Sequence, residues 1–231
     1  MKENKDGYEF VSLAAHQMRG PLGSIKGYAS MILDGDYGEV PEALLEPLQL
    51  IFKSTDSLNK TVNDFLDTSK MEQGQMRYYL KDFDLVELIQ QTIKEIRNTI
   101  REDLELKVKL PRNPLMVHAD KMKIKHVLIN LIDNANKYTE HGWIEIALER
   151  KGTHKALLCV SDSGIGFSRE TGLTLFQKFS RAAEASKVNS TGTGLGLYLV
   201  QKMIDAHHGT VWAESKGEGK GAQFYVELPS L

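Results

Sequence analysis

The chain has 231 residues, of which 41% are hydrophobic, and its formal net charge is -2. The near-neutral charge gives no electrostatic case for nucleic-acid binding. No apolar run approaches the roughly 20 residues that span a bilayer, and the N-terminus is no signal peptide. The single cysteine, Cys159, excludes an intrachain disulfide and indicates a reducing, cytoplasmic compartment.

The first forty residues predict an amphipathic helix. One apolar stripe recurs at helical spacing and consists of Phe10, Ala14, Met18, Leu22, Ile25, Ala29 and Ile32. His16 lies about 180° from the centre of this stripe, so we expect its side chain to face solvent. Pro21 has no N–H to donate to Gln17, which costs roughly 3 kcal/mol in a helix interior, and Gly20 weakens the helix further. Because the stripe continues beyond these residues, we expect a kink here and not an end.

A second helix is predicted after a turn at Asp34 to Pro41. Its apolar seam alternates four and three residues apart, in a heptad pattern that comprises Leu44, Leu48, Ile51, Thr55, Leu58, Val62 and Phe65. Two helices cannot easily bury both stripes alone. We therefore expect two hairpins to pair into a four-helix bundle, which predicts a homodimer through residues 8–70. A monomeric hairpin packed on its own second domain is the alternative.

The heptad pattern breaks at MEQGQMRYY, residues 71–79. We place a linker at 73–80, between a helical hairpin domain at 1–72 and a second domain at 81–231. In the second domain, Asp84 and Glu87 form a capping-box pattern for a helix that runs to about Ile100. Strands are expected near 104–110, 115–118, 143–151, 156–161, 210–215 and 222–228. Helices and strands together predict an α/β domain of about 150 residues.

A further helix carries candidate ligand-binding residues. Asp120 is a plausible N-cap, and an apolar stripe follows it. Asn130, Asn134 and Lys137 come at i, i+4 and i+7, so they share one face. An Asn amide oxygen can ligate Mg²⁺, and Lys137 can neutralise phosphate charge. Taken singly, these residues would also suit a polar solvent face.

Two glycine motifs lie downstream of this helix. DSGIG follows the predicted strand at 156–161, so Asp162 offers a carboxylate at a strand end, beside the flexible backbone of Gly164 and Gly166. GTGLG at 192–196 opens a helical segment that runs to His207, and a helix N-terminus favours phosphate. A glycine cluster alone usually marks a turn. Both clusters together with the preceding polar helix predict one ATP site.

The order NLIDNANKYT, DSGIG, FQKFSR, GTGLGL resembles the ATP-binding domain of sensor histidine kinases, within the Bergerat-fold ATPase group. The resemblance implies a two-layer α/β sandwich with a mixed sheet, placed after the helical hairpin. It implies that Asn134 holds Mg²⁺, that Asp162 bonds the adenine amino group, that Tyr138 lines the site and that Lys137 meets the phosphates. Segment 167–191 would be a mobile ATP lid. The ATP-binding candidates are Asn130, Asn134, Lys137, Tyr138, Asp162, Gly164, Gly166, Phe176, Phe179, Arg181, Gly192, Thr193, Gly194, Leu195, Gly196 and Leu197.

Asn130 separates this chain from other members of the ATPase group. Chaperone, mismatch-repair and topoisomerase members carry a Glu at this place, which activates water for hydrolysis. Asn130 has no carboxylate to do so. The resemblance therefore favours phosphoryl transfer to a protein side chain over ATP hydrolysis.

The sequence HQMRGPL, which begins at His16, looks like the phosphoacceptor motif of the family, normally His-Glu-x-x-Thr-Pro-Leu. His16 would be the phosphorylated residue, and Gln17, Arg19 and Gly20 complete the candidate catalytic set. Gln17 can accept a hydrogen bond but cannot take a proton, so we expect slow autophosphorylation. Gly20 has no side chain to position water, which predicts little phosphatase activity.

The resemblance implies a histidine kinase that transfers its phosphoryl group to an aspartate of a response regulator receiver domain. The chain would be the cytoplasmic core of a longer sensor protein. Two alternatives are a plain ATPase, which releases phosphate without labelling the protein, and a degenerate kinase that binds ATP or dimerises without modifying His16.

Overall fold

The structure is a computed structural model that describes residues 2–180 and 193–231, the side chains of residues 2–13 and of His16 excepted. The chain forms two compact units, Met1–Met76 and Arg77–Leu231. None of the described helices is long and apolar enough to cross a membrane.

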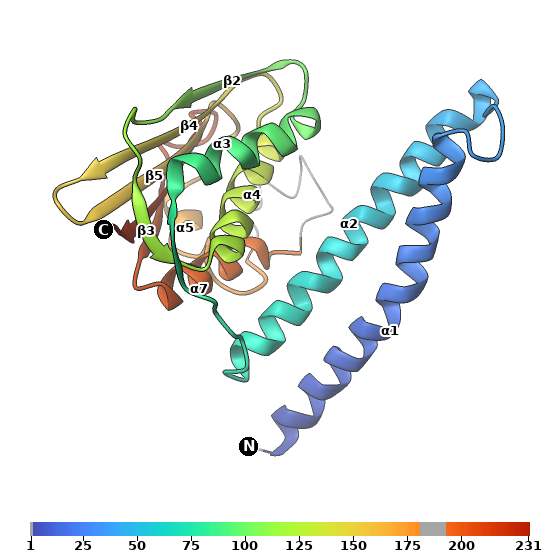
Figure 1. Ribbon diagram of the computed structural model, residues 1–231, viewed down its shortest axis with the longest axis horizontal. Coiled ribbons are helices and arrows are strands. Elements are labelled where there is room, and N and C mark those ends of the chain that lie inside the picture. The colour runs from blue at the N-terminus through green and yellow to red at the C-terminus, as the bar shows by residue number, and fades with distance from the viewer. Residues whose placement is uncertain (1, 181–192) are drawn as a thin grey trace. The chain divides into compact units, whose positions relative to one another are not determined.

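The first unit is a helical hairpin of α1 (Lys2–Leu33) and α2 (Glu42–Glu72) (Figure 1). Both helices were expected from the apolar patterns. Helix α1 continues through Gly20 and Pro21, as predicted from the stripe that extends past them. A cluster of buried apolar residues from the two helices holds the hairpin together and consists of Ala15, Leu22, Val62 and Leu66.

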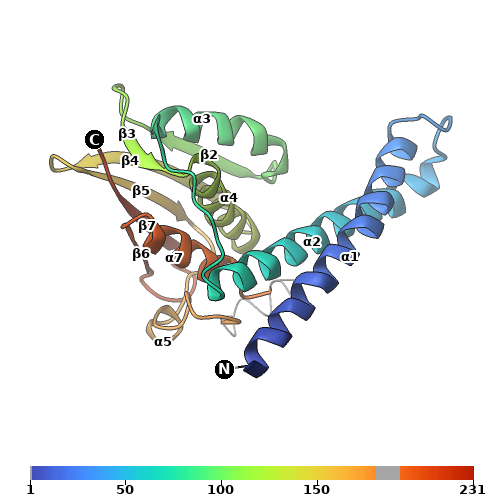
Figure 2. The same ribbon diagram turned by 60° about the horizontal axis from the view of Figure 1, so that its bottom comes forward.

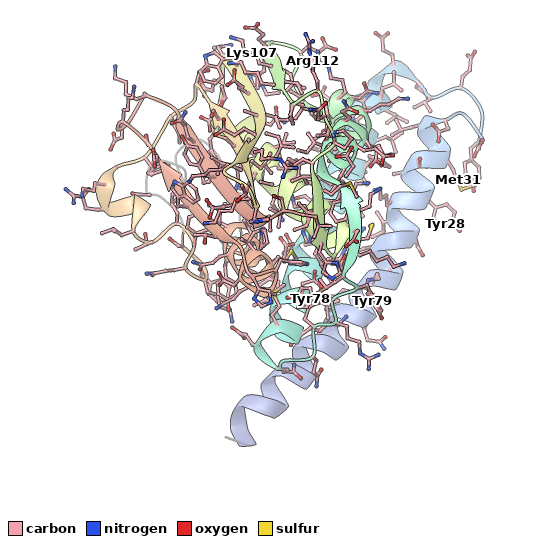
Figure 3. All side chains as sticks on the ribbon, turned by 60° about the vertical axis from the view of Figure 1, so that its left-hand side comes forward. Tyr28, Met31, Tyr78, Tyr79, Lys107 and Arg112 are labelled. Carbon is pink, nitrogen blue, oxygen red and sulfur yellow. The ribbon has the colours of Figure 1, made fainter. Side chains whose placement is uncertain are left out.

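The apolar stripes of the hairpin are only partly buried in the single chain. On α1, Leu22 and Ala29 are buried, whereas Met18 and Ile25 are 44% and 47% exposed. Figure 3 shows Tyr28 and Met31 projecting outward from the same helix. On α2 the heptad seam divides likewise: Thr55 and Val62 are buried, and the exposed members are Leu44, Ile51, Leu58 and Phe65. Each helix therefore keeps an uncovered apolar face.

The second unit is built on a five-stranded sheet of order β2-β4-β5-β7-β6. The strands are β2 (Leu104–Lys109), β4 (Gly142–Lys151), β5 (Lys155–Asp162), β6 (Thr210–Glu214) and β7 (Ala222–Pro229). Strand β2 pairs with β4 in parallel, and all other pairs in this sheet are antiparallel. The sheet is therefore mixed.

Helices α3 (Leu85–Ile96), α4 (Lys121–Tyr138) and α7 (Gly196–Ala206) cover one face of this sheet (Figure 2). The core between the two layers is apolar and closed to solvent. Its residues with no measurable exposure include Ile89, Val127, Leu131, Ile144, Ile146, Val160, Leu199 and Met203. A hairpin followed by a two-layer α/β domain with a mixed sheet confirms the expected fold class.

The structure differs from the prediction at the start of the second unit. A strand that was not predicted, β1 (Lys81–Asp84), pairs with β3 (Met116–Ala119) in a separate two-stranded sheet. With four residues, two of them Asp, β1 has too little apolar pattern to be recognised, and its partner is more than thirty residues away. The helix expected to reach about Ile100 ends at Ile96, and a 3₁₀ turn at Arg97–Thr99 follows it. A four-residue helix, α5 (Arg169–Gly172), was also not predicted.

Candidate functional site

Helix α4 carries the predicted row of polar residues from the core to the surface. Asp120 caps the helix as predicted, since its Oδ1 accepts the N–H groups of Met122 and Lys123 at 3.0 and 3.1 Å. Asn130 is 3% exposed. Asn134 is half-buried and Lys137 is exposed. The row can therefore present amide groups beside the core and a cation at the rim.

Asp162 ends strand β5 and is 6% exposed. Its Oδ1 accepts the N–H groups of Gly164 at 2.9 Å and of Ala222 at 3.3 Å. Burial disfavours the charged form and raises the pKa of Asp162 to about 6, although these two backbone donors and the nearby Thr139 hydroxyl act in the opposite direction. Neither of these two backbone hydrogen bonds uses the second carboxylate oxygen, Oδ2.

A backbone hydrogen bond holds the DSGIG turn against the C-terminal end of α4. The Ile165 N–H donates to the Tyr138 carbonyl oxygen at 3.0 Å. At Gly164, a Cβ would come within 2.1 Å of this same oxygen and 2.7 Å of Thr139 Oγ1. Only glycine fits at position 164, because the backbone of the chain itself leaves no room for a side chain. The turn and helix thus bring Asp162 and the end of α4 together.

Position 166 also requires glycine for a structural reason. Its φ is 62°, in the left-handed region that favours glycine. A Cβ at Gly166 would approach the carbonyl oxygens of Gly217 and Gly221 to 2.3 and 2.9 Å. Both glycines of DSGIG therefore close the turn against neighbouring loops, a role that the sequence did not indicate.

The GTGLG loop contacts Phe179, which lies within the segment 167–191 expected to form the lid. The Phe179 N–H donates to the Gly194 carbonyl oxygen at 3.0 Å. Gly194 has a φ of 69° and leaves no room for a Cβ, which would lie 2.8 Å from Phe179 C. Phe179 itself has a φ of 61° and is 56% exposed. A non-glycine residue in this region stores backbone strain.

Helix α7 begins directly after this loop. The Leu195 side chain has no exposure and belongs to the core, so its contribution to a ligand site would come from its backbone. A Cβ at Gly196 would lie 3.2 Å from the Asn130 side-chain oxygen. Thr193, whose Oγ1 accepts the Leu195 N–H at 3.3 Å, and Leu197 are half-buried beside it. The first turn of α7 and the polar row of α4 therefore face each other.

Two buried polar atoms in this region have no hydrogen-bond partner within the described part of the chain: Asn130 Nδ2 and Thr139 Oγ1. A buried polar atom without a partner is costly, and such atoms are usually satisfied by protein, water or ligand. Thr139 ends the motif NLIDNANKYT, but no pattern in the sequence marks it as a site residue. Together with Asp162 Oδ2, these atoms fit a bound molecule that has both donors and acceptors.

The phosphoacceptor motif lies on α1 of the first unit. Gln17 and Arg19 are exposed, and Arg19 Nη2 donates to Asn63 Oδ1 of α2 at 2.9 Å. Gly20 has nothing within 4 Å of the place of a Cβ. The expected orientation of the His16 side chain, and the candidates Arg181 and Gly192, lie outside what the structure describes. Phe176, which is described, is half-buried.

Comparison with known proteins agrees with this geometry. Residues 119–231 match the family of histidine kinase-, DNA gyrase B- and HSP90-like ATPases, and residues 8–74 match the His Kinase A (phospho-acceptor) domain. The circadian input-output histidine kinase CikA of Synechococcus elongatus is 32% identical over 96% of this chain. The chain spans 30% of the length of that relative.

Solved structures give the same result. The catalytic domain of histidine kinase ThkA is 32% identical, with a TM-score of 0.57, and the match covers 65% of this chain and 97% of that one. Full-length ShkA, solved in complex with AMPPNP, shares the fold at 23% identity with a TM-score of 0.74, over 96% of this chain and 46% of that one.

The α/β unit with its two glycine turns defines an ATPase domain of the histidine kinase, gyrase B and HSP90 type. Since a phosphoacceptor domain precedes it, the chain belongs to the sensor histidine kinases and comprises their catalytic core. The family that the motifs indicated is confirmed.

Proposed function

We propose that this chain is an ATP-dependent protein-histidine kinase that phosphorylates His16 and passes the phosphoryl group to an aspartate of a response regulator receiver domain. The hairpin at 1–72 would serve dimerisation and phosphotransfer, and 81–231 would be the catalytic domain. The observation that carries the proposal is the convergence of Asp162, the end of α4 and the first turn of α7 around buried polar atoms that lack partners among the described residues.

Adenine recognition would fall to Asp162. Its Oδ1 accepts from two backbone donors, and its Oδ2 would accept from the adenine amino group. Thr139 Oγ1 lies close to Gly164 and can donate to or accept from the same ring or a bridging water. Tyr138 would line the site. Lys137, exposed at the rim, would meet the phosphates.

A Mg²⁺ ion would be held by Asn134, with water and phosphate oxygens completing its coordination. The amide oxygen suits this ion, because Mg²⁺ prefers oxygen ligands and commonly takes only one or two from the protein. When bound, the ion would neutralise charge that develops on the phosphates during transfer. The backbone N–H groups at the start of α7 would stabilise the same charge.

In the transfer step, Nε2 of His16 would bond to the γ-phosphorus while the bond from phosphorus to the β,γ-bridging oxygen breaks, which leaves ADP. Catalysis would come from positioning and charge neutralisation, as in phosphoryl transfer generally. Asn130 supports kinase chemistry over hydrolysis because an amide cannot serve as a general base for water.

The uncovered apolar faces of α1 and α2 support a homodimer. Met18, Ile25, Ile51 and Leu58 are all more than 40% exposed in the single chain. Pairing two hairpins into a four-helix bundle would bury these side chains. The partner would then be a second copy of this chain.

One experiment separates the kinase from its alternatives. The protein is incubated with ATP labelled at the γ-phosphate and Mg²⁺, denatured, and treated with acid or alkali. A kinase of this kind gives protein-bound label that is lost in acid and survives alkali. Release of labelled phosphate without protein label would indicate a plain ATPase. Nucleotide binding with neither product would indicate a degenerate kinase.

A further inference from the structure

His207 is a buried histidine that the proposed chemistry does not use. It follows the last residue of α7 and is 4% exposed. Its ring bridges two helices: Nδ1 lies 2.7 Å from the Met203 carbonyl oxygen of its own helix, and Nε2 accepts the N–H of Asp120, which caps α4, at 2.9 Å.

These two partners fix the protonation of the ring. A carbonyl oxygen can only accept, so Nδ1 carries the hydrogen, and a backbone N–H can only donate, so Nε2 is bare. His207 is thus a neutral imidazole in one tautomer. It acts as a two-sided connector between the C-terminal end of α7 and the N-terminal end of α4.

Asp120 connects this junction to the first residues of the second unit. While its Oδ1 caps α4, its Oδ2 accepts the N–H of Tyr79 at 2.9 Å. The preceding residue, Tyr78, packs its ring edge-on against His207, with centroids 5.3 Å apart. Figure 3 labels both tyrosines on the stretch before β1. Residues 77–80 are therefore attached at the point where α4 and α7 meet.

The proposed nucleotide site lies farther along the same two helices, away from His207. Asn130 comes ten residues after Asp120, and Gly196 comes eleven residues before His207. Gly196 faces Asn130 and His207 contacts Asp120, so α4 and α7 run antiparallel. The two contacts are separated by a similar number of residues on each helix. Ten residues of helix span about 15 Å. Over so short a distance, a change in the spacing of the two helices at His207 would also change their spacing at Gly196.

We propose that His207 and Asp120 are positioning residues that couple the entering segment 77–80 to the separation of α4 and α7, and thereby to nucleotide affinity. The proposal rests on the nucleotide site described above. Movement of Tyr78 and Tyr79 would shift the junction, and nucleotide binding would reciprocally tighten the attachment of Tyr79.

Two substitutions of His207 test its two hydrogen bonds separately. His207→Gln places an amide oxygen near the position of Nε2 and can keep the bond from Asp120 across the helices. His207→Asn places an amide nitrogen near Nδ1 and keeps only the bond within α7. Binding of AMPPNP with Mg²⁺ to the full chain is measured by calorimetry, at a temperature where circular dichroism shows each variant folded. We expect the Asn variant to bind about 5- to 10-fold more weakly and the Gln variant within about 2-fold of the unmodified chain.

A second variant tests the attachment of the segment without changing His207. Asp120→Ser retains a helix-capping oxygen but removes the second acceptor that holds Tyr79. Amide hydrogen exchange at Tyr79 in the unmodified chain should slow when AMPPNP and Mg²⁺ bind, because the coupling is reciprocal. In the Ser variant, exchange at this amide should be faster and no longer respond to nucleotide.

The outcomes separate the coupling from the nucleotide site itself. Equal affinities of the Gln and Asn variants, with binding intact in the unmodified chain, would overturn the coupling and leave His207 a structural residue. If His207→Asn does not fold, a Tyr79 amide whose exchange ignores nucleotide in the unmodified chain would overturn it as well. Failure of the unmodified chain to bind AMPPNP would contradict the proposed function instead.

Discussion

Gly196 lies directly against the side-chain amide of Asn130, since a Cβ at position 196 would come within 3.2 Å of Asn130 Oδ1. The contact joins the start of α7 to the polar row of α4. It gives a reason for a small residue at the last glycine of GTGLG, even though this residue is already helical. The proposed nucleotide site would therefore depend on a close helix-to-helix approach as much as on its loops.

Gly196→Ala tests this approach. The added methyl group would push Asn130 by a few tenths of an ångström, so we expect nucleotide affinity to fall about 3- to 10-fold, while the better helix propensity of Ala offsets much of the loss in stability. AMPPNP titration measures the affinity. Gly23→Ala on α1, where a Cβ meets nothing within 4 Å, is the matched control and should leave affinity unchanged.

Asp162→Asn should stabilise the free protein while weakening nucleotide binding. The raised pKa means that the folded state holds the proton more tightly than the unfolded chain does. The cost of the buried carboxylate is therefore absent below pH about 4, grows as the pH rises to about 6, and is constant above that, where it reaches at most about 2–3 kcal/mol. Asn avoids this cost and still accepts from Gly164.

Denaturation followed by tryptophan fluorescence measures this effect, because both tryptophans, Trp143 and Trp212, lie in the second unit. The Asn variant should be more stable at pH 7.5 and equal to the unmodified protein near pH 4. A stability difference that does not change with pH would show that Asp162 does not titrate as described.

The sequence predicted the elements better than it predicted their connections. The N-cap at Asp120 and the stripes of α1 and α2 follow from local periodicity and propensity, and the structure has both. The sequence also pointed to Gly164 and Gly166, but it did not show why these positions require glycine. The atoms that exclude a Cβ come from Tyr138 and from the loop at 215–221. The exclusion depends on tertiary contacts that no local pattern encodes.

The same limit applies to single residues of the site. Thr139 gave no signal beyond its place at the end of NANKYT, and its importance comes from burial without a partner among the described residues. In the sequence, His207 gave no signal beyond its place at the end of a predicted helix. Its bond to Asp120 spans 87 positions in the chain, so only the fold reveals it.

His208→Gly should stabilise the second unit. His208 has a φ of 58° after α7, and the N–H groups of His208 and Gly209 bond to Asp205 and Ile204, as in a Schellman motif. Glycine is the preferred residue at this left-handed position, so we expect a gain of about 0.5–1 kcal/mol in the free energy of unfolding. Urea denaturation measures it. His208→Ala keeps the strain and should show no gain; equal effects of the two changes would refute the explanation.

Gly20→Thr should create phosphatase activity. Position 20 has open space around a Cβ, so a side chain can begin there without a clash. A hydroxyl four residues after His16 could orient the water that attacks a phosphorylated receiver domain, whereas Gly20 offers none. We expect dephosphorylation of a cognate regulator to be faster than with the unmodified protein. Gly20→Ala, which adds no hydroxyl, is the control. Rapid dephosphorylation by the unmodified chain would mean that another group orients the water.

Gln17→Glu should speed autophosphorylation. A carboxylate next to His16 can accept a proton or hydrogen bond from Nδ1 and make Nε2 more nucleophilic, which the amide of Gln17 does less well. Initial rates of label incorporation measure the effect, with nucleotide affinity expected to stay unchanged. A variant that is no faster would indicate that proton removal from His16 does not limit the rate.

The assignment of His16 as the phosphoacceptor is tested most directly by labelling the His16→Gln variant with γ-labelled ATP. The variant should bind AMPPNP with the affinity of the unmodified chain and keep its oligomeric state, yet incorporate no acid-labile, alkali-stable label. Loss of label with nucleotide binding intact is the predicted result. Acid-labile label that persists in the variant would contradict the account, because the phosphoryl group would then reside on another histidine.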